Sequence, residues 1–464
     1  MVYSSVIFLF YFLPLLLLGY YLMPRTLFKN LFLFIVSLLF YAWGGGKLVF
    51  LLLGVGLSAW FFSLLIAKTK FKKGFLVFAI FSYIIVLVYY KYFGFIIDNL
   101  TYMGVQGLPV LKMITTLGVS FFIFQAISYN IDVYRKNNLF EKNPAYVMLY
   151  LTMFPQLISG PLVRYHQLEQ QLKKRTFDFT RFEEGIRRFI IGLGKKVLIA
   201  NPLSFLVAQI MNTEIDLINS SVAWMGIIAF TLQLFFDFSG YTDMAIGVGK
   251  MLGFDLPENF NFPYISRSIT DFWRRWHMTL SSWLKDYLFM PLSLSLRRWG
   301  SFGVIIALMV TFTVCGIWHG PTWNFVIWGA IQGFFLAIEQ VFLQKYLSKL
   351  KAASIIYTLF VVMTGFVFVR TQTLNEAFHY LSAMFYPGTI SPLGINTFLT
   401  NEDKVVLILG ILFCIPIKMP KVFQSEIISE IKRILGVILL LAIFLLSVMA
   451  LTTETYNPFI YFRF

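Results

Sequence analysis

His319 is the residue of this sequence whose type and setting most strongly suggest chemistry. It lies in the segment Cys-Gly-Ile-Trp-His-Gly-Pro-Thr-Trp of residues 315–323, a turn between two apolar stretches. An imidazole at membrane depth is costly to bury, so it is usually paired, open to a water-filled cavity or used in a reaction. The alternative is a core histidine that only donates a hydrogen bond to a carbonyl oxygen.

The composition predicts the kind of fold that must position this histidine. Of the 464 residues, 58% are hydrophobic and 13% are charged, and apolar stretches recur from end to end. This balance is typical of an all-α polytopic membrane protein, whereas a membrane β-barrel would show short alternating segments. The net charge of +16 comes from basic residues between the apolar stretches, which indicates cytoplasmic loops and no nucleic-acid partner. The two cysteines, Cys315 and Cys414, do not have the spacing of a metal site, so no metal is predicted.

Basic residues between the apolar stretches also predict the orientation of the chain, because cytoplasmic loops carry an excess of lysine and arginine. Arg25 and Lys29 follow the first apolar stretch, Val6 to Leu22, so we predict a retained first span with the N-terminus outside. The alternation continues to the last span, which places the C-terminus outside as well. The further predicted spans are residues 31–41, 48–67, 75–97, 114–133, 186–211, 222–236, 301–317, 323–342, 355–368, 405–417 and 434–451.

Two stretches depart from simple alternation. Residues 146–158 are apolar but too short to span, and basic residues flank them, which predicts a re-entrant or interfacial segment. Residues 301–342 also have basic flanks, so we predict a hairpin with His319 at its apex, about 25 Å from the cytoplasmic face. No internal repeat is apparent, and residues 1–464 are predicted to form one domain.

The segment from Phe236 to Lys285 is unusually polar for its surroundings and is interleaved with phenylalanine and tryptophan. We predict short helices in the cytoplasmic half of the protein that line a polar cavity. An ordinary cytoplasmic loop is the alternative, although an exposed loop seldom carries so many aromatic residues. The polar residues of this segment are Asp237, Ser239, Tyr241, Asp243, Asp255, Glu258, Asn259, Asn261, Arg267, Asp271, Arg274, Arg275, His277 and Lys285.

An ordered set of motifs resembles the membrane-bound O-acyltransferase family, and more narrowly its bacterial alginate and peptidoglycan O-acetyltransferase branch. The motif Trp-His-Gly at residues 318–320 follows Phe-Trp-Arg-Arg-Trp-His at residues 272–277. A lone Trp-His-Gly would be a weak signal, but the family's other motifs occur in the expected order. They are Phe-Pro-Gln-Leu-Ile-Ser-Gly-Pro at 154–161, Asp-Phe-Ser-Gly-Tyr-Thr-Asp at 237–243 and Pro-Glu-Asn-Phe-Asn-Phe-Pro-Tyr at 257–264.

The resemblance implies about eleven to twelve transmembrane helices, with re-entrant and short helices, around a central funnel that has His319 at its neck. It implies transfer of an acyl group from a cytoplasmic thioester to a hydroxyl on the outer side. His277 matches the family's second histidine, whose role is either structural or in shaping the donor tunnel.

The C-terminal segment Phe-Ile-Tyr-Phe-Arg-Phe of residues 459–464 follows a predicted span, residues 434–451, and is therefore predicted to be external. It resembles the tail of a small partner peptide in teichoic-acid D-alanylation, whose tyrosine is thought to carry the acyl group. The resemblance implies that Tyr461 is an acyl relay and that Phe459 and Phe464 anchor the tail. The alternative is an aromatic anchor at the membrane interface.

The chemistry implied by this resemblance needs a base but no bound cofactor. A thioester is already activated, whereas a hydroxyl is a poor nucleophile until a base removes its proton. Neutral imidazole at His319 can act as this base, and burial favours the neutral form. The group that stabilises the oxyanion cannot be identified in the sequence. The residues predicted to line the substrate tunnel are Trp318, Trp323, Asp237, Tyr241, Asn259, Asp271 and Arg274, although aromatic residues in such positions often only pack.

The resemblance therefore implies an O-acetyltransferase in the lipid of a bacterial inner membrane, and the distribution of basic residues predicts a multi-pass chain with both termini outside. The donor is acetyl-CoA or the acetyl thioester of a carrier protein. An external SGNH-type transferase or esterase is the expected partner, and the acceptor is an envelope polysaccharide, peptidoglycan ahead of alginate or another exopolysaccharide. The alternative function is a transporter or flippase, in which His319 and the acidic residues 237–243 line a permeation path. An assembly scaffold accounts least well for the polar groups at depth.

Overall fold

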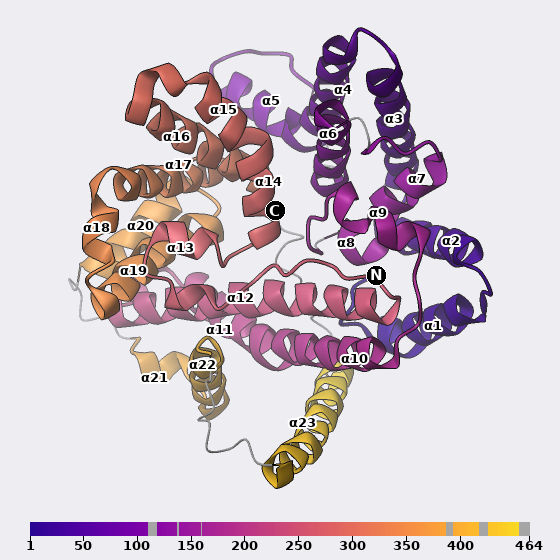
Figure 1. Cartoon of the computed structure of the whole chain (residues 1–464). Coiled ribbons are helices and arrows are strands. Elements are labelled where there is room, and N and C mark those ends of the chain that lie inside the picture. The colour runs from indigo at the N-terminus through magenta and orange to yellow at the C-terminus, as the bar shows by residue number, and fades with distance from the viewer. Residues whose placement is uncertain (110–117, 137–138, 159, 387–392, 417–425, 454–464) are drawn as a thin grey trace. The chain divides into compact units, whose positions relative to one another are not determined.

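The computed structural model is built from helices joined by short connections (Figure 1). It describes the chain except residues 110–117, 137–138, 159, 387–392, 417–425 and 454–464, and it leaves the side chains of residues 426–432 undescribed. Among the described residues there is no strand, and Ile218 and Leu393 form an isolated bridge. The predicted all-α fold is confirmed.

The chain divides into two compact units. Two of the boundaries between them fall within long helices, α10 (Phe179–Gly194) and α12 (Ser220–Met251), and the third follows Pro257 in the segment after α12. Unit 1 consists of Met1–Phe189 and Ala245–Pro257, and unit 2 of Ile190–Met244 and Glu258–Phe464. The other helices of unit 1 are η1 (Phe8–Phe12), α1 (Leu13–Leu22), α2 (Thr26–Gly45), α3 (Leu48–Lys68), α4 (Lys72–Leu87), η2 (Val88–Tyr92), α5 (Phe93–Tyr102), α6 (Val119–Arg135), α7 (Pro144–Thr152), α8 (Phe154–Leu157) and α9 (Tyr165–Lys173).

Unit 2 contains the predicted catalytic hairpin and the last helix of the chain. Its helices are η4 (Lys195–Ala200), α11 (Asn201–Met211), η5 (Ile215–Leu217), η6 (Pro263–Ile265), α13 (Ile269–Trp273), α14 (Met278–Leu284), η7 (Lys285–Phe289), α15 (Met290–Ser295), η8 (Arg297–Trp299), α16 (Gly300–His319), α17 (Trp323–Ile338), η9 (Glu339–Leu343), α18 (Gln344–Leu347), α19 (Lys351–Arg370), α20 (Leu374–Phe385), α21 (Ile395–Phe398), α22 (Asn401–Phe413) and α23 (Glu426–Thr453).

Nine helical stretches of the described chain are long and apolar enough to cross a membrane, and a shorter apolar stretch occupies Phe8–Leu22. The protein is therefore a polytopic helical membrane protein, as predicted. The nine stretches are Thr26–Gly45, Leu48–Lys68, Lys72–Tyr102, Phe179–Met211, Ser220–Met251, Arg297–His319, Trp323–Leu347, Lys351–Arg370 and Arg433–Thr453.

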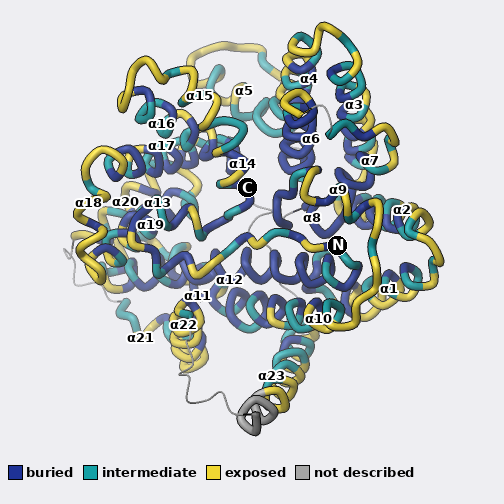
Figure 2. The backbone as a smooth tube through the Cα atoms, in the orientation of Figure 1, coloured by how far each residue is buried: buried dark blue, intermediate teal, exposed yellow. Residues whose placement is uncertain are grey.

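In unit 1, α3, α4 and α6 pack side by side (Figure 1). Helix α6 is buried along most of its length, and Asn130 on it connects all three helices (Figure 2). The Asn130 Nδ2 donates to the carbonyl oxygen of Ala59 at 2.8 Å, and the hydroxyl of Tyr83 donates to Asn130 Oδ1 at 3.0 Å. A buried polar side chain is tolerated here because its hydrogen bonds are made within the bundle.

The short apolar segment of residues 146–158 is broken, as predicted. Helix α7 ends at Thr152 and the four-residue α8 begins at Phe154, and the residues around the break are buried. Pro155 lies at the start of α8, where a missing backbone N–H costs no helical hydrogen bond. The broken backbone is thus enclosed by protein, which is the condition for irregular structure at membrane depth.

Helix α12 corrects one prediction. Instead of a span that ends near residue 236 and gives way to short helices, a single helix runs from Ser220 to Met251, so Asp237 and Asp243 lie inside it. The helix continues through these charges because two consecutive lysines of η4 neutralise them. Lys196 Nζ lies 2.7 Å from Asp237 Oδ1, and both side chains are almost fully buried. Lys195 Nζ lies 2.6 Å from Asp243 Oδ2.

Small residues let α10 and α12 approach until their backbones touch. In unit 2, a methyl group on Gly192 would lie 2.6 Å from the carbonyl oxygen of Gly240, and one on Gly240 would lie 2.7 Å from that of Gly192. In unit 1, a methyl group on Gly185 would lie 2.7 Å from the carbonyl oxygen of Gly247. Membrane helices associate closely through such small residues, and here the contact brings the two lysines to their carboxylates.

Helix α23 is the least buried of the apolar helices. Only 6% of its most apolar window lies inside the protein, and Figure 2 shows most of its described part as exposed or intermediate. Its exposed side chains are largely apolar, which suits lipid. It contacts η4, and Ile443 lies so close to Gly194 that a methyl group there would clash at 2.6 Å. The residues that follow Thr453, including the aromatic tail, lie outside the described residues.

Candidate active site

His319 is the last residue of α16, and α17 begins four residues later at Trp323. The predicted helical hairpin with Trp-His-Gly at its apex is therefore confirmed. The two helices touch at Gly316 and Gly329, where a methyl group would lie 2.2 Å from the Phe325 carbonyl oxygen or 2.3 Å from that of Phe312. This contact fixes the position of the apex relative to the first turns of α17.

Aromatic rings surround the imidazole of His319, which is 8% exposed. The ring centroid of Trp318 lies 4.8 Å away and that of Trp328 lies 5.0 Å away, both edge to face. The ring of Phe325 is nearly parallel to the imidazole, with centroids 6.4 Å apart. These three neighbours are aromatic and carry no charge, so the ring contacts of the imidazole are apolar.

A cavity of about 20 Å³ opens beside His319. About 10–15 Å³ is enough to hold one water molecule, so the space admits a group of roughly that size. Its walls come from α12, α16, α17, α19 and the loop after α13. The lining residues are Leu234, Phe238, Trp276, His319, Phe325, Trp328, Phe366 and Val369.

His277 lies between α13 and α14, is fully buried and has a left-handed backbone with φ 44° and ψ 51°. The backbone N–H of Thr279 donates to Asn259 Oδ1 at 3.2 Å, which identifies this atom as an acceptor. His277 Nδ1 lies 3.1 Å from the same oxygen and therefore donates its hydrogen. The His277 ring packs edge to face on Phe238 at 4.8 Å and lies 6.3 Å from Trp318.

These contacts predict a supporting role for His277, and burial lowers its pKa to about 3. The unfolded chain, with a pKa near 6.5, binds a proton between these two values while the folded protein does not. The contribution of His277 to the free energy of unfolding is therefore fully present above pH 6.5 and is lost as the pH drops towards 3. Each pH unit within this range lowers the free energy of unfolding by about 1.4 kcal/mol, so we expect this free energy to fall by about 2 kcal/mol between pH 6.5 and 5.

The variant His277→Asn tests this role, because asparagine tolerates left-handed backbone and keeps an N–H donor for Asn259. We expect the thermal midpoint of the purified variant to fall less between pH 7.5 and 5 than that of the unmodified protein. Acyl transfer should fall by about tenfold at most, since the side chain does not line the cavity. A complete loss of transfer with an unchanged thermal midpoint would instead give His277 a direct part in the reaction.

The structure places the other predicted tunnel residues outside the lining of this cavity. Trp318 contacts the imidazole, Trp323 is half-exposed, and Arg274 is exposed. Asp237 is paired with Lys196, Tyr241 is buried in α12, Asn259 holds His277 and Thr279, and Asp271 accepts from Arg275 Nε at 2.9 Å. Phe459, Tyr461 and Phe464 lie outside the described residues.

Glu339 is a buried polar residue that the sequence reading missed. Its carboxylate accepts hydrogen bonds from the backbone N–H groups of Ile269 and Thr270 at 2.6 and 2.9 Å, and from the Thr270 hydroxyl at 2.7 Å. The hydroxyl of Tyr357 donates to it at 3.3 Å. Glu339 thus caps the N-terminus of α13, the helix that leads to Trp276 in the cavity wall. A lone carboxylate in the apolar stretch of residues 323–342 was the available signal.

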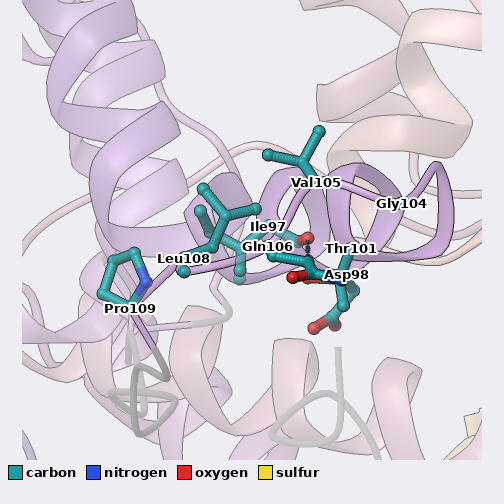
Figure 3. A pocket seen from close by; sticks show the side chains of 10 residues that line it. Ile97, Asp98, Thr101, Gly104, Val105, Gln106, Leu108 and Pro109 are labelled. Carbon is teal, nitrogen blue, oxygen red and sulfur yellow. Dashed lines mark hydrogen bonds between the residues drawn. The ribbon is translucent and has the colours of Figure 1, made fainter.

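A second, larger cavity of about 600 Å³ lies in unit 1 (Figure 3). It is lined by residues 94–109 and contains Asp98 but no histidine and none of the predicted site residues. A base next to a shaped space is what acyl transfer requires, so the smaller cavity is the better candidate site despite its volume. Among the described residues, no three histidine, cysteine, aspartate or glutamate side chains are grouped so that they could hold a metal ion.

These features define a class: a polytopic helical membrane protein with a buried histidine at a hairpin apex and a small aromatic cavity beside it. The family model of the membrane-bound O-acyltransferases, MBOAT, matches residues 141–372, which include His277, His319 and the hairpin of α16 and α17. The chain belongs to this family, and it is an enzyme of the O-acyltransferase class. The family assignment favours acyl transfer over the transporter or flippase alternative.

Individual relatives agree with the family assignment. The chain is 35% identical to the probable alginate O-acetylase AlgI of Pseudomonas putida over 100% of both chains. It is 32% identical to the peptidoglycan O-acetyltransferase of Helicobacter pylori, over 83% of this chain and 80% of the relative. It is 30% identical to the teichoic acid D-alanyltransferase of Bacillus subtilis, over 52% of this chain and 63% of the relative.

Proposed function

We propose that the protein transfers an acetyl group from a cytoplasmic thioester, acetyl-CoA or a carrier-protein thioester, for O-acetylation of a polysaccharide outside the membrane. The observation that carries this proposal is the buried imidazole of His319 next to a cavity of about 20 Å³ at the hairpin apex. A space of this size suits a short acyl group rather than a long chain, and the apolar rings around it favour a neutral base.

His319 acts as the general base. It takes the proton of the attacking hydroxyl while that oxygen bonds to the thioester carbon, and it then returns the proton to the leaving thiolate. No metal or bound cofactor takes part in the step, because the thioester supplies the activation. Tyr461 is the first acceptor, and its aryl ester passes the acetyl group to an external partner of the SGNH-type transferase or esterase class.

The acceptor is a glycan hydroxyl of the cell envelope. The relatives named alginate O-acetylases align with the whole chain, and the relative named peptidoglycan O-acetyltransferase aligns with most of it, which supports a polysaccharide acceptor of either kind. We place the protein in the bacterial cytoplasmic membrane with both termini outside, since lysines and arginines gather in alternate loops.

Removal of the gene from its own bacterium tests this function. We expect alkali-labile acetate to disappear from one polysaccharide fraction, either extracellular polysaccharide or purified peptidoglycan, and to return when the full-length protein is supplied again. The fraction that loses acetate identifies the acceptor. Unchanged acetate in every envelope fraction of the deletion strain would contradict the proposal.

A further inference from the structure

The indole N–H of Trp328 is a buried donor beside the proposed base. Trp328 on α17 is 4% exposed, and among the described residues its Nε1 has no hydrogen-bond partner. An unpaired buried donor costs folding free energy, so its retention calls for an explanation. We propose that Trp328 is a catalytic residue whose N–H stabilises the oxyanion formed on the acyl group, an inference that rests on the proposed acyl transfer at His319.

The two rings are placed as this role requires. The centroids of Trp328 and His319 lie 5.0 Å apart, with the ring planes nearly perpendicular, and both residues line the same cavity. A base and an oxyanion donor must reach two oxygens on one carbon, each through a hydrogen bond of about 2.9 Å. Two rings 5.0 Å apart at the wall of one small cavity are close enough for both groups to reach the same carbon centre.

On the α19 side, the residue next to the indole nitrogen is a glycine, which places no side chain against it. A methyl group on Gly365 would lie 3.5 Å from Trp328 Nε1, and Phe366 and Val369 of the same helix form part of the cavity wall. The neighbouring Trp273 shows the contrast, because its Nε1 donates to Gln332 Oε1 at 3.1 Å. The two adjacent indoles therefore differ, because the Trp273 N–H donates within the fold and the Trp328 N–H has no hydrogen-bond partner among the described residues.

The reaction step can be written with these groups in place. The hydroxyl oxygen of the acceptor bonds to the thioester carbon and gives its proton to a ring nitrogen of His319. The carbonyl electron pair moves onto oxygen, and Trp328 N–H donates to that oxyanion without changing its own bonds. When the pair returns, the carbon–sulfur bond breaks and the thiolate leaves with the proton from His319. An ester and a free thiol result.

The hairpin contact keeps this donor in register with the base. Trp328 precedes Gly329, whose backbone lies against Gly316, three residues before His319. Neither glycine has a side chain, so the two helix backbones are in direct contact. This contact holds the separation of the two rings when the acyl group enters. An oxyanion donor that is already in position needs no reorganisation during the reaction, which is the source of its effect on rate.

The test uses membrane vesicles that contain the full-length protein and [¹⁴C]acetyl-CoA as the probe, with acetyl incorporation into polymer as the rate. Trp328→Phe removes the N–H, and benzothienylalanine at the same position removes it while keeping the size of the indole. We expect both to lower kcat about 100-fold or more, with little change in KM for the thioester, as for loss of one oxyanion donor. The benzothienylalanine protein should keep its thermal midpoint.

Trp224→Phe is the matched control. Its Nε1 donates to the Met384 carbonyl oxygen at 2.9 Å, and Trp224 does not line the cavity. This variant should lower the thermal midpoint and leave kcat unchanged. If both Trp328 variants turn over normally while His319→Ala is inactive, the oxyanion role is wrong and the proposed function stands. A raised KM with normal kcat would also overturn the role, whereas an active His319→Ala protein would remove the proposed function itself.

Discussion

Replacement of His319 by alanine will abolish acetyl transfer while leaving the protein folded. The imidazole is the base nearest the cavity, and general-base catalysis together with activation of the nucleophile contributes about 10²–10⁴-fold to a rate. The side chain packs among rings that remain in place, so the variant should express normally and lose little of its thermal midpoint. We would measure acetyl incorporation from labelled acetyl-CoA in membrane vesicles and alkali-labile acetate in cells.

Another histidine of the same chain provides the control. His379 on α20 is exposed and is not part of the cavity lining, so His379→Ala should transfer acetyl groups at the normal rate. His319→Gln keeps a polar side chain of similar length but lacks a basic nitrogen, and it should be as inactive as the alanine variant. Retained O-acetylation in either His319 variant, at normal protein levels, would show that another group is the base.

Replacement of Tyr461 by phenylalanine will abolish acetylation of the glycan without impairing binding of the thioester. A phenol with a pKa near 10 is a good leaving group, so its acetyl ester retains much of the transfer potential of the thioester. The substitution keeps the ring and its packing and removes the oxygen alone. In cells that lack the external partner, mass spectrometry of the C-terminal peptide should find one added acetyl group on Tyr461 of the unmodified protein.

The tail contains its own matched control, because Tyr456 lies five residues before Tyr461. Tyr456→Phe should leave glycan acetylation and the acetyl label unchanged. Labelling of a cysteine introduced after Phe464 by an impermeant reagent should show that the C-terminus is outside. Full glycan acetylation in Tyr461→Phe would mean that the acetyl group passes directly to the partner, and a cytoplasmic C-terminus would exclude the relay on geometric grounds.

The helical hairpin that carries His319 could be predicted from sequence because two simple signals coincide. Basic residues flank both ends of residues 301–342, and the apolar stretch is interrupted at one place, which is where α16 ends and α17 begins. The short, broken segment of α7 and α8 followed from its length in the same way. Such signals are local, since each depends on residues that are neighbours in the chain.

The course of α12 could not be predicted by the same reasoning. Asp237 and Asp243 suggested the end of a membrane span, but lysines about forty to fifty residues earlier in the chain neutralise them. The cavity lining is equally non-local: Leu234, Phe366 and Val369 have no distinguishing pattern in sequence and meet only through packing. Trp328 is an ordinary apolar residue of a span until its unpaired N–H and the neighbouring His319 are seen together.

The small volume of the cavity beside His319 would also limit hydrolysis of the acyl donor by water. A general base that activates a hydroxyl can also activate water, and water outnumbers any acceptor in the cell. A space that admits about one water molecule leaves no room for additional water once the acyl group and the acceptor hydroxyl are beside the base. Entry of the acetyl group therefore expels the water that would otherwise hydrolyse it. If His319 is the base, as proposed, tight packing around it would conserve the activated acyl donor as well as favour a short acyl group.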